Sequence, residues 1–545
     1  TSGTVRAEED VGEVMPINLR KLAMGIVPYG NKSEKKEEPE LSDSDCSSHS
    51  TFSRSGSLGR SASSEEGVAV VAHSPMASSP QRSRADSTAG NAERTPDEES
   101  ILNGWVRRFH ALQQQELKPW ILCDGSTKFT YVNVSVKGAR NNNEDAIYTD
   151  GQMFAVYDGH GGKHASMLAQ KEIAKQFYKA TGNATDEELV APVNPGPPLV
   201  VDALDEAYAA TQAAMPTSHS KSQAGSTGVT CWVHPAKQGG AAAKVFLAVL
   251  GDSQAMMFNC HTGEIPHVPT RTWDEEQGTL MGPGVKATRA SVTEPHAITG
   301  ALKVDKTTGR AIGMRHDPLG VGFREYNLLK KRHKFPPTKV PFCISNMPGE
   351  ERWRLLNLEP TRALGHRNNK EPPMRHPEVY EWEVTAPDDQ MLLLACDGFF
   401  SKNAFVSPEA VTMFLADPVA FCKRKDFFRG TCLEVLMEEM GESDLLPDPS
   451  KVSMAELFHQ IHEAVNDKLS DDTWCDAHDS AYEYLSVFAQ ENPIPNIRTS
   501  PAKTLLAASS LAVLMVSDDN ISCSVVYLDG KSHYDGKRFE LGSEP

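Results

Sequence analysis

Residues 154–162 read FAVYDGHGG, which is the most informative motif in the chain. An apolar, strand-like run ends in a carboxylate, Asp158, which is followed by a histidine and three glycines. One Asp-Gly pair after a strand is usually only a turn. Three glycines around one histidine are costly for a plain turn, because glycine loses the most backbone freedom on folding. The motif therefore indicates a functional site at the end of a strand.

Two further apolar runs end in the same way. Residues 391–395 lead into Asp397, and residues 245–250 lead into Asp252. A carboxylate just beyond a strand is held by rigid backbone, and several such ends that converge would form an oxygen-only site. Hard divalent cations such as Mg²⁺ and Mn²⁺ prefer ligands of this kind.

Other charged residues stand beside strand-like segments. Arg140, Glu144 and Asp145 precede residues 146–149, and Asp519 opens the last strand-like run. An arginine, several carboxylates and a histidine together are typical of metal-assisted displacement at phosphorus.

The pattern of apolar residues favours an α+β fold. Strand-like runs and helical stretches do not alternate strictly along the chain, which argues against a doubly wound parallel sheet. Strands are predicted at 131–136, 154–157, 245–250, 391–395 and 522–528, and helices at 163–179, 200–214, 408–415, 454–468 and 502–511.

Composition excludes several classes of function. The chain has 545 residues and a net charge of −18, which is the wrong sign for a protein that covers nucleic acid. No run approaches the roughly 20 apolar residues of a membrane-spanning helix. The ten cysteines show no metal-binding spacing, so we expect free thiols and an intracellular protein, cytoplasmic or nuclear. The chain begins at Thr1, which leaves room for a preceding targeting segment.

Residues 1–104 are predicted to be a mostly disordered region, because they are rich in serine and charge and poor in large apolar side chains. Arg-Ser and Ser-Pro pairs such as Arg60-Ser61 and Ser74-Pro75 are candidate kinase sites. A serine- and arginine-rich linker also contains such pairs by chance.

The chain contains seven motifs in the following order: RNNNED, FAVYDGHGG, GSTGVT, VFLAVLGDSQ, TRALGH, LLLACDG and SDDN. This ordered set makes the chain similar to the metal-dependent serine/threonine protein phosphatases of type 2C. The resemblance implies two packed antiparallel β-sheets flanked by helices, a four-layer αββα sandwich with the metal site in the cleft at one end. It implies a phosphatase domain over residues 105–535, with insertions near 260–355 and 418–501 and a tail at 536–545.

The resemblance also implies the metal ligands. Asp158 would bridge two core ions, Mg²⁺ or Mn²⁺, with the Gly159 carbonyl on one of them. Asp397 and Asp519 would hold the first ion. Glu144 would reach the second directly or through water, with Asp145 supporting the cluster.

Two residues match the positions that act on the substrate. Arg140 would grip phosphate, and His160 would donate a proton to the departing Ser or Thr oxygen. For His160, ligation or packing beside the metals is the alternative.

Three residues depart from the family pattern: Gln254 stands where arginine is usual, and His366 and Ser401 where aspartate is usual. The missing carboxylate at Ser401 leaves Asp252 to hold a third ion, which should bind weakly.

Two function classes remain open. The first is a protein-serine/threonine phosphatase that acts on phosphoprotein substrates and that we expect to be a monomer. The second is a catalytically weak relative that binds phosphoproteins as a scaffold.

The insertions offer two further features. Residues 329–334, LKKRHK, could attract acidic phosphoproteins or could be a solvated basic loop. Leu457, Phe458 and Ile461 have the spacing of a helix face that packs on the core.

Overall fold

The structure is a computed structural model. It divides into two units, Thr1–Thr88 and Ala89–Pro545, and all described residues belong to the second. The described residues are 118–121, 128–181, 197–216, 224–236, 241–274, 279–281, 288–299, 302–304, 311–314, 321–332, 344–346, 352–355, 358–367, 373–400, 405, 407–428, 431, 452–468, 476–517 and 519–531. The predicted disordered region with its kinase sites, the tail and Ser401 lie outside them.

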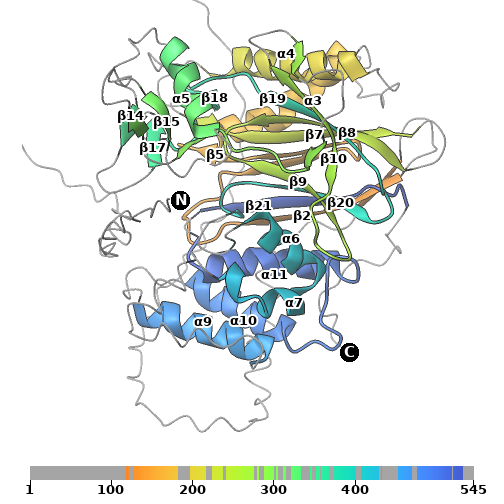
Figure 1. Cartoon of the computed structure of the whole chain (residues 1–545), viewed down its shortest axis with the longest axis vertical. Helices are drawn as coiled ribbons and strands as arrows, with labels where there is room; N and C mark the ends of the chain where they lie inside the picture. The colour runs from red at the N-terminus through yellow and green to blue at the C-terminus, as the bar shows by residue number, and fades with distance from the viewer. Residues whose placement is uncertain are drawn as a thin grey trace, which may run out of the picture. The chain divides into compact units, whose positions relative to one another are not determined.

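Two antiparallel sheets form the centre of the described fold (Figure 1). The five-stranded sheet has the order β1 (Lys118–Ile121), β2 (Lys128–Val136), β21 (Ile521–Tyr527), β20 (Gln390–Ala395) and β9 (Gln254–Asn259). The eight-stranded sheet has the order β11 (Thr279–Met281), β10 (His267–Asp274), β19 (Glu378–Glu383), β8 (Ala242–Leu250), β7 (Gly228–Pro235), β4 (Met153–Tyr157) and β3 (Ala146–Thr149), with β12 (Thr288–Ala290) on β10.

Side chains alternate between the two faces of each sheet, as the period of two in a strand requires. On β20, Leu392 and Leu394 enter the core between the sheets, whereas Leu393 faces the helical layer beside the five-stranded sheet. On β4, Phe154 enters the same inter-sheet core and Tyr157 faces the opposite helical layer. Both faces of each sheet are therefore covered, which explains the nearly continuous apolar runs in the sequence.

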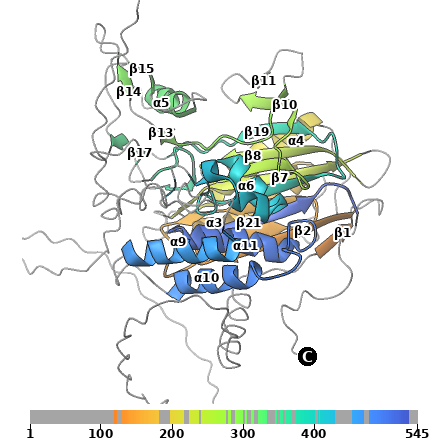
Figure 2. The same ribbon diagram turned by 60° about the horizontal axis from the view of Figure 1, so that its bottom comes forward.

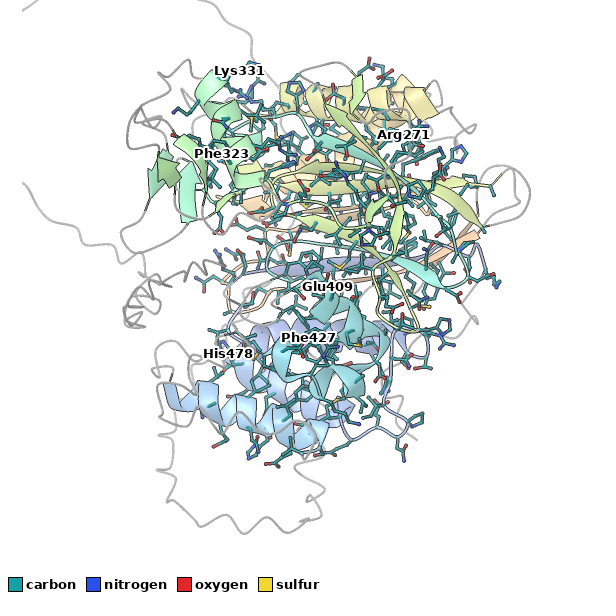
Figure 3. The ribbon with its side chains drawn as sticks, in the orientation of Figure 1. Arg271, Phe323, Lys331, Glu409, Phe427 and His478 are labelled. Atoms are coloured by element: carbon teal, nitrogen blue, oxygen red, sulfur yellow. The ribbon has the colours of Figure 1, made fainter. Side chains whose placement is uncertain are left out.

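Helices cover the two outer faces (Figure 2). Helices α3 (His164–Ala180) and α4 (Pro197–Ala214) pack on the eight-stranded sheet. The five-stranded sheet carries α6 (Pro408–Ala416), α7 (Pro418–Cys422), α9 (Met454–Lys468), α10 (Asp476–Phe488) and α11 (Pro501–Leu514), with the 3₁₀ helix η1 at Lys425–Phe427. Phe427 and His478 lie in this second helical layer (Figure 3). The fold is the expected four-layer αββα sandwich.

Smaller elements lie around this sandwich. A three-stranded sheet joins β18 (Leu364–Gly365), β6 (Gly225–Ser226) and β5 (Gly159–His160). The first expected insertion contains α5 (Val321–Arg332), the sheet β13 (Ile298–Thr299), β17 (Arg352–Leu355) and β16 (Ile344–Asn346), and the hairpin β14 (Leu302–Val304) and β15 (Ala311–Met314). The interpretation of residues 329–332 as a loop was wrong, because they form the last turn of α5, with Lys331 at its outer end (Figure 3).

Each of the ten predicted elements is present, with ends that differ by no more than three residues. The predicted core face of α9 is confirmed, since Leu457, Phe458 and Ile461 are at most 2% exposed. Among the described residues, five cysteines are free and buried, and no helix has the length and apolarity to cross a membrane.

Candidate active site

Three strand-end aspartates lie together at one end of the sandwich. Asp158 follows β4, Asp252 follows β8 and Asp397 follows β20, so both sheets contribute. One carboxylate oxygen from each lies within 4.8 Å of the others. The sequence indicates that these three strand ends could converge, and it assigns Asp252 to a weaker third ion. The structure places Asp252 directly beside Asp158 and Asp397.

Two more carboxylates adjoin this group. Burial and the nearby charge of Asp397 raise the pKa of Asp519 to about 7, and burial, together with Asp397, raises the pKa of Asp145 to about 7. Burial and the neighbouring aspartates also hold the pKa values of Asp158 and Asp252 well above their usual range. We define Asp145, Asp158, Asp252, Asp397 and Asp519 as the carboxylate cluster.

The donor set of the carboxylate cluster fits a hard divalent cation. All five groups offer oxygen, which is the ligand that Mg²⁺ and Mn²⁺ prefer. Burial and mutual repulsion make ionised carboxylates unfavourable here unless positive charge lies between them.

The last strand and the loop before β3 are joined by Asn520. Its Oδ1 accepts a hydrogen bond from the Glu144 amide at 2.9 Å, and its Nδ2 donates to the carbonyls of Lys137 at 2.8 Å and Asn142 at 2.9 Å. The same loop carries Arg140, whose Nη2 donates to Asp519 Oδ2 at 2.9 Å. Asn520 was missed as a positioning residue, although its place beside Asp519 at the start of a strand was visible in the sequence.

Glu144 contacts the glycine-rich loop after β4. Its Oε2 accepts a hydrogen bond from the Gly162 amide at 2.9 Å, and its carbonyl accepts one from the Ser166 hydroxyl. A Cβ at Gly159 would lie 2.2 Å from the Glu144 carbonyl oxygen, so only glycine fits at this close approach. On the other side of the loop, the Thr227 amide donates to the Asp158 carbonyl at 2.9 Å.

The sheet of β5, β6 and β18 brings two histidines together. His160 pairs with Gly225 on β6, Gly225 pairs with Gly365 on β18, and His366 follows. The Nε2 atoms of His160 and His366 are 2.7 Å apart. A Cβ at Gly225 would lie 2.1 Å from the Nε2 of His366 and 2.3 Å from that of His160, so a side chain there would separate the rings.

Their surroundings favour the neutral form of both histidines at pH 7. Burial and the neighbouring His366 lower the pKa of His160 to about 3. Burial and the charge of Arg375 lower the pKa of His366 to about 4. One ring must therefore donate its Nε2 proton and the other must accept it.

Gln254, which stands where the family pattern has arginine, forms a hydrogen bond with the backbone of a neighbouring segment. Its Nε2 donates to the Thr293 carbonyl at 2.8 Å. This bond ties the start of β9 to the segment that follows β12.

A largely buried ion-pair network connects α5 to the segment between β17 and β19 and to the first residue of β19. The Glu325 carboxylate accepts hydrogen bonds from Arg362 at 2.7 and 3.0 Å and from the Thr361 hydroxyl at 2.8 Å. Arg324 donates to both oxygens of Glu378, at 3.2 and 3.1 Å. His296 lies 3.0 Å from the same carboxylate and accepts a hydrogen bond from the Gly251 amide, next to Asp252. No motif in the sequence indicated this network.

Comparison with known proteins identifies a related family. Residues 124–270 and 344–412 match the family described as protein phosphatase 2C. Asp519 lies beyond the matched residues. No curated protein has a significant sequence match to this chain.

Three solved structures illustrate the similarity. A sex-determining protein of C. elegans has 16% identity and a TM-score of 0.35, with 73% of this chain and 64% of that chain covered. This chain thus spans slightly less than two thirds of that protein. The Ser-Thr phosphatase MsPP of Mycobacterium smegmatis, in complex with cacodylate, has 15% identity, a TM-score of 0.32 and coverage of 73% and 97%. A serine-threonine phosphatase 2C of Toxoplasma gondii has 15% identity, a TM-score of 0.34 and coverage of 76% and 98%.

Proposed function

We propose that the chain, of which residues 124–270 and 344–412 match the protein phosphatase 2C family, is a metal-dependent phosphatase that hydrolyses phosphoserine and phosphothreonine in proteins. The observation that carries this proposal is the convergence of Asp158, Asp252 and Asp397 from both sheets within 4.8 Å. Carboxylates of Asp519 and Asp145 adjoin them, which adds to the negative charge of the site.

Asp158, Asp397 and Asp519 would hold two Mg²⁺ or Mn²⁺ ions, with the Gly159 carbonyl, Glu144 and Asp145 completing their surroundings. Asp252 would hold a third, weaker ion. The chemistry that these cations supply when bound is activation of water as the nucleophile and neutralisation of phosphate charge.

Arg140 would bind the phosphate. Its guanidinium is half-exposed and already donates to a carboxylate of the cluster, so it can turn toward a substrate anion at the same edge. A planar guanidinium suits phosphate because it can donate two parallel hydrogen bonds.

His160 would donate a proton to the departing Ser or Thr oxygen. Such oxygens are poor leaving groups unless they are protonated. His366 stands next to the atom that would carry this proton, since the two Nε2 atoms are 2.7 Å apart. A phosphate dianion nearby would favour the protonated form of the pair.

The second candidate function is phosphoprotein binding without turnover. The observation in its favour is the contact between His366 Nε2 and His160 Nε2. This contact occupies the nitrogen of His160 that would donate a proton to the leaving group. The carboxylate cluster favours the enzyme, since a pure binding module needs no such concentration of buried negative charge.

One experiment separates the two candidates. Phosphate release from a phosphothreonine peptide is measured for the full chain with Mn²⁺, with Mg²⁺ and with excess chelator, beside the Asp397→Asn variant. The enzyme releases phosphate only with metal, and the variant does not. Peptide binding without phosphate release under all conditions would support the second candidate, and turnover in excess chelator would refute the metal-dependent mechanism.

A further inference from the structure

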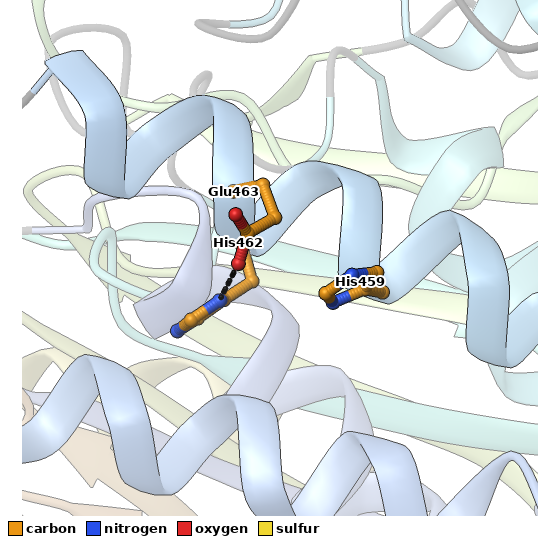
Figure 4. A group of neighbouring side chains, drawn as sticks. All are labelled: His459, His462 and Glu463. Carbon is orange, nitrogen blue, oxygen red and sulfur yellow. Dashed lines mark ion pairs between the residues drawn. The ribbon is translucent and has the colours of Figure 1, made fainter. Parts of the chain in front are cut away.

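Helix α9 carries a second group of metal-ligand side chains. His459, His462 and Glu463 lie on neighbouring turns of its outer face, and one ligand atom from each lies within 4.8 Å of the others (Figure 4). The opposite face of α9 packs in the core through Leu457 and Phe458, which fixes the orientation of the helix. Unlike the carboxylate cluster, this group offers imidazole nitrogen.

The ring of His462 is held in place by α10. It stacks on the Tyr482 ring, with centroids 4.1 Å apart and planes at 21°, and its side chain is 13% exposed. Its Nδ1 lies 3.5 Å from Glu463 Oε1, and its Nε2 lies 3.4 Å from Asp479 Oδ1. One nitrogen thus faces the group and the other faces a carboxylate behind it. Histidines that bind metals are commonly oriented by such a carboxylate.

His459 has a similar partner. Its Nδ1 lies 3.1 Å from the Tyr482 hydroxyl, so Nε2 is the nitrogen that we assign to a ligand. Tyr482 therefore contacts both imidazoles. Glu463, which is 58% exposed, supplies an oxygen that can move.

We propose that His459, His462 and Glu463 bind one divalent transition-metal ion, with Zn²⁺ as the representative, and that Asp479 and Tyr482 of α10 orient the two imidazoles. Two imidazoles and one carboxylate are typical zinc ligands, and they are poor ligands for Mg²⁺. Water would complete a four-coordinate site.

The geometry needs only a small adjustment. Ligands about 2.1 Å from a tetrahedral ion lie roughly 3.4 Å apart, whereas the present atoms are separated by up to 4.8 Å. Rotation of the exposed His459 and Glu463 side chains can close this difference, while His462 stays stacked on Tyr482. Binding would then link α9 to α10 and stabilise the folded state.

The test uses the full chain after chelator treatment, in excess Mg²⁺ so that the carboxylate cluster is occupied. Zn²⁺ uptake is measured by equilibrium dialysis, and Co²⁺ is used as a spectroscopic substitute. We expect the wild type to bind one Zn²⁺ more than His459→Gln or Glu463→Gln, and to give an intense tetrahedral Co²⁺ spectrum that both variants lose. The affinity for Zn²⁺ should fall at least ~100-fold.

Matched controls are His261→Gln, an exposed histidine outside the group, and Glu456→Gln on the same helix. Both should keep the Zn²⁺ and the Co²⁺ spectrum. The replaced residues are exposed, and circular dichroism confirms that each variant is folded. Equal Zn²⁺ uptake by the wild type and His459→Gln would overturn the proposal, as would extra Zn²⁺ that disappears in Asp158→Asn instead. This outcome is independent of whether the chain hydrolyses phosphate.

Discussion

His160 and His366 face each other through their Nε2 atoms at 2.7 Å, although 206 residues separate them in the sequence. Strand β6 brings them together, since it lies between β5, which contains His160, and β18, which ends one residue before His366. Because both rings are neutral, one Nε2 donates its proton to the other, and removing either ring changes the hydrogen bonding of the other.

We therefore expect each of the single variants His160→Ala and His366→Ala to lower kcat. On a phosphothreonine peptide, His160→Ala should lose about 10²- to 10⁴-fold, the usual range for a general acid, and the double variant should lose little more than His160→Ala alone. Aryl phosphates with acidic leaving groups need no proton, so the loss on them should be small.

His366→Asp restores the residue that the family pattern has at this position and should recover part of the activity lost in His366→Ala. Parallel kinetics on the two substrate types provide the measurement. Equal losses on phosphothreonine and aryl phosphate would assign the pair a purely structural role.

The second prediction concerns the repulsion within the carboxylate cluster. Asp158→Asn should abolish metal-dependent activity, yet it should make the metal-free protein more stable at pH 7 by at least ~1 kcal/mol. The reason is that burial and neighbouring charges raise the pKa of Asp158, so its ionised form destabilises the folded state at neutral pH. Thermal unfolding with and without Mn²⁺ measures both effects, and the rise in Tm on adding Mn²⁺ should shrink.

Asp202→Asn, on the exposed side of α4, is the matched control and should change neither quantity. A metal-free Asp158→Asn protein that is less stable than the wild type would show that Asp158 is stabilised by partners in the chain rather than repelled.

The third prediction concerns phosphate binding. Arg140→Ala should raise KM about 10- to 100-fold, the loss expected for a charge-assisted hydrogen bond worth roughly 1.5–3 kcal/mol. The change in kcat should be smaller, because the guanidinium would contact phosphate in both the ground and the transition state. Steady-state kinetics on the phosphothreonine peptide check this, with the exposed Arg289→Ala as control. A large fall in kcat at unchanged KM would instead mean that Arg140 acts through Asp519, its partner at 2.9 Å.

The parts of this fold that could be predicted are those encoded locally. The strands around Asp158 and Asp397 are continuous apolar runs because both faces of their sheets are covered, and their ends are marked by Asp-Gly. The approach of Asp397 to Asp158 and Asp252 depends on how the two sheets pack, because β20 belongs to one sheet and β4 and β8 belong to the other, and no local pattern records this packing.

The features that could not be predicted depend on very short strands and on a helix with an interrupted apolar face. The strands that join His160 to His366 contain two residues each, too few to give a periodic signal. Helix α5 was hidden because one of its buried positions is Glu325, which breaks the apolar stripe that Tyr326 and Leu329 would otherwise form.

The fourth prediction tests the place of Asp252. If Asp252 holds only a weaker third ion, Asp252→Asn should shift the activation curve to higher Mg²⁺ concentration and keep the maximal rate. Its oxygen lies within 4.8 Å of Asp158 and Asp397, so it could equally serve the core ions. Activity titrated against Mg²⁺ distinguishes these two roles. Loss of activity at every Mg²⁺ concentration would show that Asp252 is a ligand of the core ions.

The last prediction concerns the buried pair that anchors α5. Although burial opposes ionisation of Glu325, the charge of Arg362 and the neighbouring His296 lower its pKa to about 2, from 4.5. Glu325→Gln leaves Arg362 buried without its ion-pair partner and should reduce the free energy of unfolding at pH 7 by ~3–5 kcal/mol.

A carboxylate with a lowered pKa stabilises the folded state fully above its unfolded pKa and loses this contribution as pH falls toward the folded value. The difference between the wild type and Glu325→Gln should therefore be constant from pH 7 to about pH 5 and should shrink between pH 4.5 and pH 2. Urea unfolding across this range is the measurement, with the exposed Glu206→Gln on α4 as control. A difference that does not change with pH would mean that the variant loses packing or hydrogen bonds rather than the charge of Glu325.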